Sequence, residues 1–486
     1  MNISRFVFRN FFFPVFLVFC SCFSIAVIAS PPVFVVASQV YAASTFYGGW
    51  RDVVAGVKTI QMLKSQYPES KISFIVGSSY DMGNRHSKDK YDTFSTISKI
   101  DGVEVILINA HEDCAQECER ATEKAKILLD SADLIIHAPS FIISPIAKNS
   151  DQYVGKMIYF NGYHKGSYIG LKAEDKYIQG GMVYLDTGLC QAGVGAVSKV
   201  RNGMFLKAKE LPSREFDSEF LRENLTIPAE GEGLEKSFYF NYAYSVINFT
   251  ELVLFPHFVE GTSTDNIKIV TSVPIGIESH TKNIFRMSAL MGDELTINKI
   301  TLIREGREDL VINNSEADKL ITGRSITIIS PRAYTLDDSL RMSKYAKCSV
   351  STGDHSMADP LSMGRLPIPS IRHIGDSARA LCSDVRSFVD SYDGEKLLKD
   401  MGEIFEACAM ATGVINDACS ADVGGDGVEL GRLNDAIRSY AEFGKNQWLQ
   451  FEDLYVKHLL SNDGNFLEDN LLKCIERKLT KEELSD

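Results

Sequence analysis

Residues 348–369 read CSVSTGDHSMADPLSMGRLPIP, and this stretch says most about how the chain folds. Cys348 to Ser351 is typical of a short strand, a Gly-Asp turn follows, and an amphipathic helix is expected from about Ser356 until Gly364 ends it. A strand that runs through a small polar loop into a helix leaves backbone N–H groups without helical partners. Together with the helix dipole, these groups make an anion site at the carboxyl end of the strand.

Upstream of this stretch, buried-strand patterns alternate with helical patterns. Apolar β-branched runs predict strands, and apolar residues at helical spacing predict helices between them. The first series of expected strands covers residues 33–38, 71–79, 103–110, 132–140 and 156–163, with helices at 50–64 and 113–131. A small polar segment at 260–266 is typical of a linker, and a second series follows it. That series has expected strands at 267–274, 299–305, 325–331 and 348–351, with helices at 280–291 and 336–346.

The alternation of strand and helix predicts an α/β protein with two Rossmann-like domains. A length of 486 residues fits two domains of ordinary size. We expect an N-terminal α/β domain over residues 31–262 and a C-terminal α/β domain over 263–440. Helical patterns continue beyond these domains, so residues 441–486 are expected to form C-terminal helices.

The first 30 residues differ from the rest of the chain. Two arginines precede FFFPVFLVFCSCFSIAVIAS, which carries no charge, and this order is that of a signal peptide or a single membrane anchor. In either case the body of the protein would be exported or anchored, with residues 10–30 associating with the membrane. The third interpretation is a mis-started extension, which would leave the protein in the cytoplasm.

Composition narrows the classes of function. A formal net charge of −13, with no block of Lys and Arg, argues against a nucleic-acid partner. No G-x-G-x-x-G, P-loop, H-E-x-x-H or G-x-S-x-G motif occurs, so nicotinamide, P-loop, zinc-protease and serine-hydrolase chemistry have no support. No metal site and no cofactor are expected.

The order of parts from about Ile326 to Pro369 resembles the donor-binding stretch in the C-terminal half of GT-B glycosyltransferases. In that family a sequence of the type SGxxSxxEAxxxGxP holds the diphosphate and sugar of a nucleotide-sugar donor. The resemblance implies that the two Rossmann-like domains face a cleft. It also implies which residues would bind the donor. The phosphates would be bound by Ser351, Thr352, Gly353 and Ser356. Asp354 or His355 would face the sugar or the ribose. Asp359 would bind hydroxyl groups of the donor.

Two departures from the family pattern weaken this assignment. Pro360 follows Asp359 where many relatives have Ala, and the Glu-x7-Glu pattern of one retaining branch is absent. The alternative interpretation of the motif is an ordinary strand, turn and helix with a good N-cap.

Five further residues, in three regions of the chain, are candidates for the site. The loop after the first strand contains Gly48 and Gly49, which allow a ligand close to the backbone, and Asp52, which could orient or deprotonate an acceptor hydroxyl. His137 ends the fourth strand, where ligands of α/β folds bind, and Glu278 lies in a loop that contacts phosphate in the resembled family. Each region also has a purely structural interpretation. The loop with Gly48 and Gly49 could be an ordinary glycine turn, His137 could be a hydrogen-bonded histidine of the core, and the loop with Glu278 could be a simple connection from strand to helix.

These patterns lead to one hypothesis and one rival. The hypothesis is a metal-independent glycosyltransferase-like enzyme that transfers a sugar from a nucleotide sugar to the hydroxyl of an unknown acceptor, with Asp52 and His137 as catalytic candidates. The rival is an exported two-lobed protein that closes on a small ligand, or a catalytically inactive scaffold with the same fold.

Overall fold

The computed structural model describes the chain in segments, and all structural statements below concern these residues. They are residues 30–40, 50–78, 100–108, 115–138, 143–161, 183–186, 211, 213–230, 232, 237–241, 252–257, 260, 265–271, 281–282, 284–285, 288, 296–314, 323–332, 334–351, 354–369, 375–391, 445–461 and 466–480.

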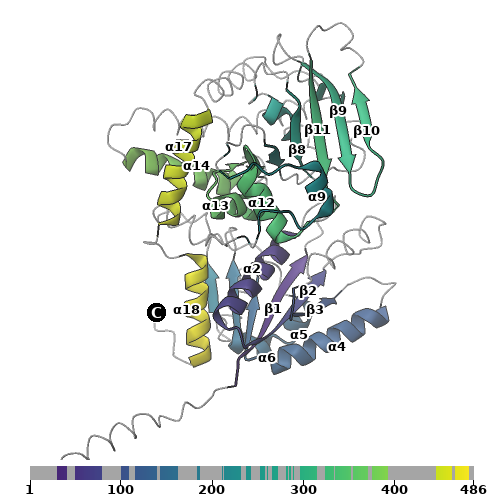
Figure 1. The fold of residues 1–486 in the computed structure, drawn as a ribbon. Coiled ribbons are helices and arrows are strands. Elements are labelled where there is room, and N and C mark those ends of the chain that lie inside the picture. The colour runs from purple at the N-terminus through teal and green to yellow at the C-terminus, as the bar shows by residue number, and fades with distance from the viewer. Residues whose placement is uncertain are drawn as a thin grey trace, which may run out of the picture.

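The first domain is built on a six-stranded sheet in the order β3-β2-β1-β4-β5-β6, in which each neighbouring pair is parallel (Figure 1). This is the doubly wound order, and the direction of winding reverses between β1 and β4. The strands are β1 (Val33–Val40), β2 (Lys71–Ser78), β3 (Glu104–Ile108), β4 (Leu134–His137), β5 (Met157–Asn161) and β6 (Val183–Asp186).

Both faces of this sheet are covered, which explains why β1 is apolar without alternation. Phe34 and Val36 contribute to the core on one face, and Val35 and Ala37 to the core on the other. Helices α2 (Trp50–Gln66) and α18 (Leu467–Thr480) cover the first face. The opposite face is covered by α4 (Ala115–Ser131), α5 (Ser144–Lys148), α6 (Ser150–Tyr153) and the short helix η2 (Val154–Lys156).

The second domain contains a seven-stranded sheet in the order β10-β9-β11-β8-β7-β12-β13. Its strands are β7 (Tyr239–Asn241), β8 (Ile267–Val270), β9 (Thr296–Arg304), β10 (Leu310–Asn313), β11 (Gly323–Ser330), β12 (Ser349–Ser351) and β13 (Ile368–Pro369). The hairpin of β9 with β10 is antiparallel, and the other neighbouring pairs are parallel.

Two elements that precede residue 263, the expected start of the C-terminal domain, pack with the second sheet. Strand β7 lies between β8 and β12 in the second sheet. Helix α9 (Glu219–Asn224) contributes Leu221 to a core that also contains Val270 and Met342. Strand β7 is therefore part of the second sheet and α9 packs beside it, although the sequence analysis grouped both with the N-terminal domain.

The expected C-terminal helices are present, and they pack on different domains. Helix α17 (Lys445–Leu460) packs on α14 (Gly375–Ser391) of the second domain, where the Tyr455 hydroxyl donates to Asp384 at 2.6 Å. Helix α18 then returns to the first domain, where Leu471 and Ile475 join the core beside α2 (Figure 1). The chain therefore crosses from the second domain back to the first.

The sequence predicted most of the larger elements within a few residues. It did not predict the short strands β6, β7, β10 and β13, because two to four residues are too few to show a period. Within the expected helix at 280–291, the described residues 281–282, 284–285 and 288 are helical.

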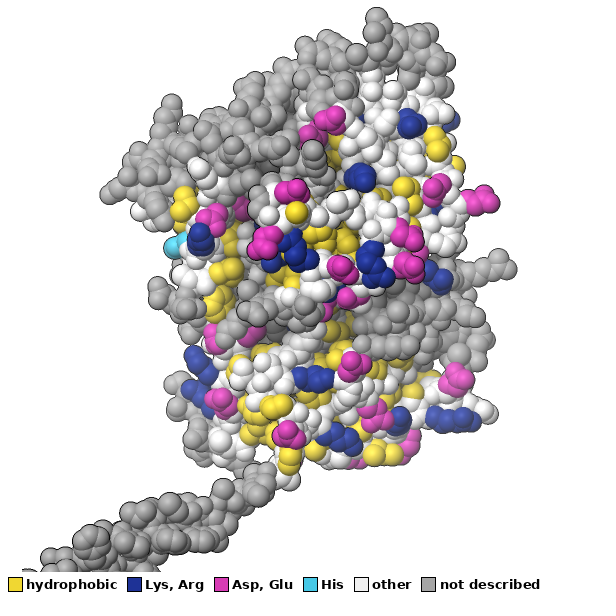
Figure 2. All heavy atoms as spheres, viewed as in Figure 1, with side chains coloured by type: hydrophobic (Ala, Val, Ile, Leu, Met, Phe, Trp, Pro, Cys, Tyr) yellow, Lys and Arg dark blue, Asp and Glu magenta, His cyan; other side chains and the backbone are white. Residues whose placement is uncertain are grey.

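The exposed surface mixes the two signs of charge. Figure 2 shows acidic and basic side chains interspersed over both domains on the face that it draws. Residues 10–29 of the hydrophobic segment lie outside the described residues. Among the helices of the described part of the chain, none is both long and apolar enough to cross a membrane.

Candidate functional site

The strand-loop-helix unit expected from the sequence is present as β12 followed by α13 (Asp354–Ser362). Residues 354 and 355 open the helix, two residues before the expected start at Ser356. Gly364 adopts a positive φ of 81° and the amide of Arg365 donates to the Pro360 carbonyl, so the helix ends where the sequence indicated.

Ser351 and Ser356 are joined across the loop that connects strand to helix. The Ser351 hydroxyl donates to the Ser356 carbonyl at 2.8 Å. Pro360 lies four residues after Ser356 inside α13, and a proline has no N–H to donate to that carbonyl. The Ser351 hydroxyl thus supplies a donor where the helix lacks one.

Arg365, just after α13, anchors this unit to its surroundings. Its guanidinium donates to the carbonyls of Lys344, Ala346 and Lys347 at 3.1, 2.7 and 3.0 Å, and it pairs with Glu452 of α17. The carbonyls lie at and after the end of α12 (Leu336–Tyr345), where a positive charge is favoured. The unit is therefore held in place from its carboxyl-terminal side.

Asp359 connects the two domains. One of its carboxylate oxygens accepts from Lys58 Nζ of α2 at 2.6 Å, and the other accepts from the Ser339 hydroxyl of α12 at 3.2 Å. The Lys58 and Asp359 side chains are only 9% and 10% exposed. This residue, expected to bind donor hydroxyls, therefore lies where the helix of one domain meets a helix of the other.

Helix α12 also reaches the first domain at its start. Leu336 packs against the core that contains α2. The preceding residue, Thr335, caps the helix because its hydroxyl accepts from the Asp338 amide at 3.0 Å. Both α12 and α13 begin at carboxyl ends of strands in the second sheet and approach the first domain (Figure 1).

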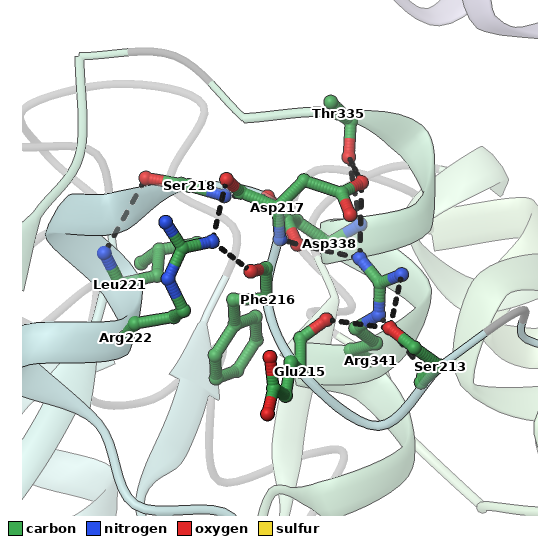
Figure 3. A network of polar contacts seen from close by, with 10 residues as sticks. All are labelled: Ser213, Glu215, Phe216, Asp217, Ser218, Leu221, Arg222, Thr335, Asp338 and Arg341. Carbon is green, nitrogen blue, oxygen red and sulfur yellow. Dashed lines mark hydrogen bonds and ion pairs between the residues drawn. The ribbon is translucent and has the colours of Figure 1, made fainter.

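A buried ion pair fixes the start of α12 to the segment before α9 (Figure 3). Asp338 accepts from Arg341 at 2.8 Å and from the backbone amides of Asp217 and Ser218 at 2.7 and 3.0 Å. Arg341 also pairs with Asp217 at 3.0 Å and donates to the Ser213 carbonyl at 3.2 Å.

The electrostatics of this network favour its charged form. Burial acts to raise the pKa of Asp217, but hydrogen bonds from Arg341 and Thr335 hold that pKa below its ordinary value. Burial acts to lower the pKa of Arg341, and its hydrogen bonds to Asp217 and Asp338 nevertheless raise it. The network is an element of structure, because its two central side chains, Asp338 and Arg341, are buried.

His137 ends β4 at the reversal of the first sheet, as the sequence indicated, and both of its ring nitrogens are engaged. Nδ1 lies 2.8 Å from the Ala138 carbonyl, and Nε2 accepts from the Ile143 amide at 3.3 Å. The ring is fully buried and stacks on Tyr159. Burial lowers the pKa of His137 to about 4, although the contact with Ala138 acts in the opposite direction. The imidazole is therefore neutral at pH 7, with Nδ1 as the donor.

The structure describes only part of the remaining candidates. Asp52, Asp354 and His355 lie in the first turns of α2 and α13, and their side chains are outside the description. Outside the described residues altogether lie Gly48, Gly49, Glu278, Thr352 and Gly353.

Sequence reasoning missed three residues that organise this region: Lys58, Ser339 and Arg365. Arg365 lies inside the motif at residues 348–369, but nothing in the sequence indicated that α12 would end beside it. Lys58 follows Val57 in α2, and most residues around it in the helix are apolar and buried. Because a lysine in such surroundings is rarely buried without a partner of opposite charge, its position indicated that such a partner exists. Among the described residues, no group of three or more His, Cys, Asp or Glu side chains could hold a metal ion.

No protein-family model matches the chain, and no curated protein is similar to it in sequence. Solved structures of glycosyltransferases match over most of the length of this chain. A glycosyl transferase family 9 protein of Veillonella parvula has 11% identity and a TM-score of 0.30, covering 69% of this chain and 80% of that one. MurG of Acinetobacter baumannii has 10% identity and a TM-score of 0.33, covering 87% and 99%.

HepE of Anabaena, in complex with UDP and glucose, has 10% identity and a TM-score of 0.31, covering 88% of this chain and 99% of that one.

Proposed function

We propose that the chain is a glycosyltransferase of the GT-B type, which transfers a sugar from a nucleotide-diphosphate donor to an acceptor hydroxyl. One observation carries the proposal. The β12–α13 unit lies in the mostly parallel sheet of the second domain, and α13 meets α2 of the first domain through Asp359 and Lys58. Ligands of such folds bind outside the carboxyl ends of the strands, so both domains would contribute to one site.

The donor would bind at the start of α13. Backbone N–H groups of its first turn would meet the diphosphate, and the helix dipole would stabilise the charge that develops on the leaving group. Asp359 would bind a hydroxyl of the sugar. Its oxygens already accept from Lys58 and Ser339, and each carboxylate oxygen has a further acceptor site.

The acceptor would bind near the start of α2. Its oxygen would form a bond to the anomeric carbon as the bond from that carbon to the diphosphate oxygen breaks, and its proton would pass to a general base. Asp52 in the first turn of α2 is the better candidate for this base. His137 has both ring nitrogens engaged and a low pKa, which favours a role in shaping the loop between β4 and α5.

We also propose that the hydrophobic run at residues 10–30 directs export or anchors the chain to a membrane. Fractionation of cells that produce the full chain, with and without residues 1–30, tests this. Recovery of both forms in the same soluble cytoplasmic fraction would contradict it.

Ligand-dependent thermal stability of the purified full chain tests the proposed activity. Nucleoside diphosphates and nucleotide sugars are the ligands, and Gly353→Asp places a carboxylate in the loop where the diphosphate would bind. A ligand at 100 times its Kd should add about 2.7 kcal/mol to the free energy of unfolding, and the variant should lose that gain. Gly306→Asp, at an exposed turn of the same domain, is the matched control.

The nucleotide sugar that contains a stabilising nucleoside diphosphate should also act as a donor of its sugar to water or to an added acceptor, measured as release of that nucleoside diphosphate. Absence of stabilisation by every nucleotide in wild-type protein would overturn the proposal. The two-lobed binding protein and the inactive scaffold would then remain.

A further inference from the structure

We propose that strand β10, at the edge of the second sheet, pairs antiparallel with β10 of a second copy of this chain, so that the two sheets join across a twofold axis. The inference is independent of the proposed function. In the strand order β10 stands at one end, and β12 and β13 stand at the other. The pairing therefore lies at the sheet edge opposite the β12–α13 unit.

The outer side of β10 is open. Among the described strands, β10 has β9 as its neighbour on one side and none on the other, and Figure 1 shows it at the outer edge of the second sheet. Its sequence LVIN holds no charged residue and no proline, which are residues that commonly keep a sheet edge from pairing. Val311 is 54% exposed. An apolar edge of this kind is a template for another strand.

The direction of the backbone groups follows from the register of β10 on β9. The amide of Asn314, one residue past β10, donates to the carbonyl of Asn298 in β9 at 2.9 Å. Residues that bond to the neighbouring strand alternate along an antiparallel pair, so Ile312 also directs its N–H and C=O groups to β9. The N–H and C=O groups of Val311 and Asn313 therefore point away from β9, to the open edge.

This open edge is complementary to itself. When two identical strands pair antiparallel about a twofold axis, Val311 lies opposite Val311 of the second copy, and the amide of each donates to the carbonyl of the other. Leu310 then lies opposite Ile312, which adds aliphatic pairs across the axis. One residue before the strand, Asp309 lies opposite Asn313, so no acid faces an acid. These features favour a second copy over an unrelated strand as the occupant.

The size of the contact limits its strength. β10 has four residues, and a pair of such strands buries less than the roughly 1,200 Å² at the lower end of stable protein interfaces. We therefore expect a weak dimer with a Kd of about 1–100 µM, which forms at high protein concentration and dissociates on dilution.

Charge substitutions at the axis test the pairing in the purified full chain, with the dimer Kd measured by sedimentation equilibrium. Val311→Lys places two lysines opposite each other and should raise the Kd by at least about tenfold, and Val311→Asp should do the same with two aspartates. An equimolar mixture of the two variants places a lysine opposite an aspartate, and its Kd should return to within about threefold of the wild-type value. The matched control is Ile127→Lys on α4, at a side chain that is 60% exposed, and it should leave the Kd unchanged.

Proline substitutions test the direction of the hydrogen bonds. Asn313→Pro removes an amide proton that points to the open edge, so it should weaken the dimer and change the Tm of the dilute monomer by less than about 2 °C. Ile312→Pro removes an amide proton that bonds to β9, and it should lower that Tm by about 4 °C or more. Calorimetry below the wild-type Kd measures both values.

Each outcome decides the proposal. A wild-type chain that stays monomeric up to about 200 µM overturns it. A dimer that Val311→Lys and Ile127→Lys weaken equally, or not at all, uses another surface and also overturns it. Two monomeric charge variants whose mixture stays monomeric would show that Val311 does not face itself, and the occupant of the edge would then not be a second copy. An equal loss of Tm in the two proline variants would contradict the assigned direction of the Asn313 amide. Should Val311→Lys not fold, loss of the dimer in Asn313→Pro at an unchanged Tm supports the pairing, and an unchanged Kd in that variant overturns it.

Discussion

At the scale of single residues, His137 makes stability depend on pH. Its pKa is about 4 in the folded protein against an ordinary value of 6.5, because burial disfavours the charged ring. Protonation therefore favours unfolding. The stabilising contribution of the neutral ring is complete above pH 6.5 and is lost as the pH falls towards 4. The proton would also displace the bond that Nε2 accepts from the Ile143 amide.

The variant His137→Asn tests this because asparagine does not titrate. We expect the difference in free energy of unfolding between wild type and variant to shrink by about 2–3 kcal/mol between pH 7.5 and pH 4.5. Urea titrations at four or five pH values measure it. Parallel curves for the two proteins across this range would contradict a buried neutral histidine.

The loss of Asp338 should lower stability strongly. Its carboxylate binds Arg341 and two backbone amides, and both charged side chains are buried. Asp338→Ala leaves the Arg341 guanidinium short of a partner, so we expect the free energy of unfolding to fall by about 3–5 kcal/mol. Asp390→Ala, at an exposed position on α14, should change it by less than about 0.5 kcal/mol. Urea unfolding compares the two variants, and equal midpoints would argue against the network.

At the scale of elements, α2 lies close to the first sheet because Gly56 has no side chain. A Cβ at this position would come within 2.7 Å of the Phe74 ring in β2. Alanine is the better helix former by about 1 kcal/mol, but the clash should exceed that gain. We expect Gly56→Ala to destabilise the protein by about 1–2 kcal/mol in urea unfolding. Combination with Phe74→Leu should recover part of the loss, and a stabilised single variant would contradict the close packing.

The sequence predicted the elements whose patterns are long and uniform. β1 has four consecutive residues buried on alternating faces, and the helix ending at Gly364 has a clear stop signal. It could not predict pairings that depend on tertiary contact. Nothing in YFN at 239–241 shows that β7 lies between β8 and β12, or that the Asn241 side chain accepts from the Val350 amide. For this reason the sequence analysis grouped β7 with the first series of elements.

The candidate site was predictable in part by the same logic. Local spacing located the strand, loop and helix around Ser351 to Gly364. One hydrogen-bond partner could have been predicted from the sequence. Pro360 inside a helix has no amide proton for the carbonyl four residues earlier, and the Ser351 hydroxyl donates to that carbonyl. The partner of Asp359 could not have been predicted, since Lys58 is 301 residues away and meets it only once both domains have folded.

Across the whole protein, the two domains are connected by a crossover of the chain and by an ion pair. The chain crosses back from α17 on the second domain to α18 on the first, and α2 and α13 meet at Lys58 and Asp359. The pair is nearly buried, so removing one partner leaves a charge in a poorly solvated position. The ion pair should therefore couple the stability of one domain to that of the other.

A double-mutant cycle with Lys58→Met and Asp359→Leu measures that coupling. Each single variant should lower the free energy of unfolding, because it leaves the charge of the other residue buried and unpaired. The double variant leaves no such charge, so its loss should be smaller than the sum of the two single losses. We expect an interaction energy of about 1–3 kcal/mol. Lys64→Met is the matched control, because Lys64 on the same helix bonds within its own domain to the Asp101 carbonyl.

The same variants report on how the domains unfold. In wild type the pair should make the two domains melt together, whereas in Lys58→Met the calorimetric transition should broaden or split, since each domain then unfolds with less influence from the other. High salt should reproduce little of this effect, because a nearly buried pair is screened weakly. A single sharp transition in Lys58→Met, together with an additive cycle, would show that α18 alone holds the domains together.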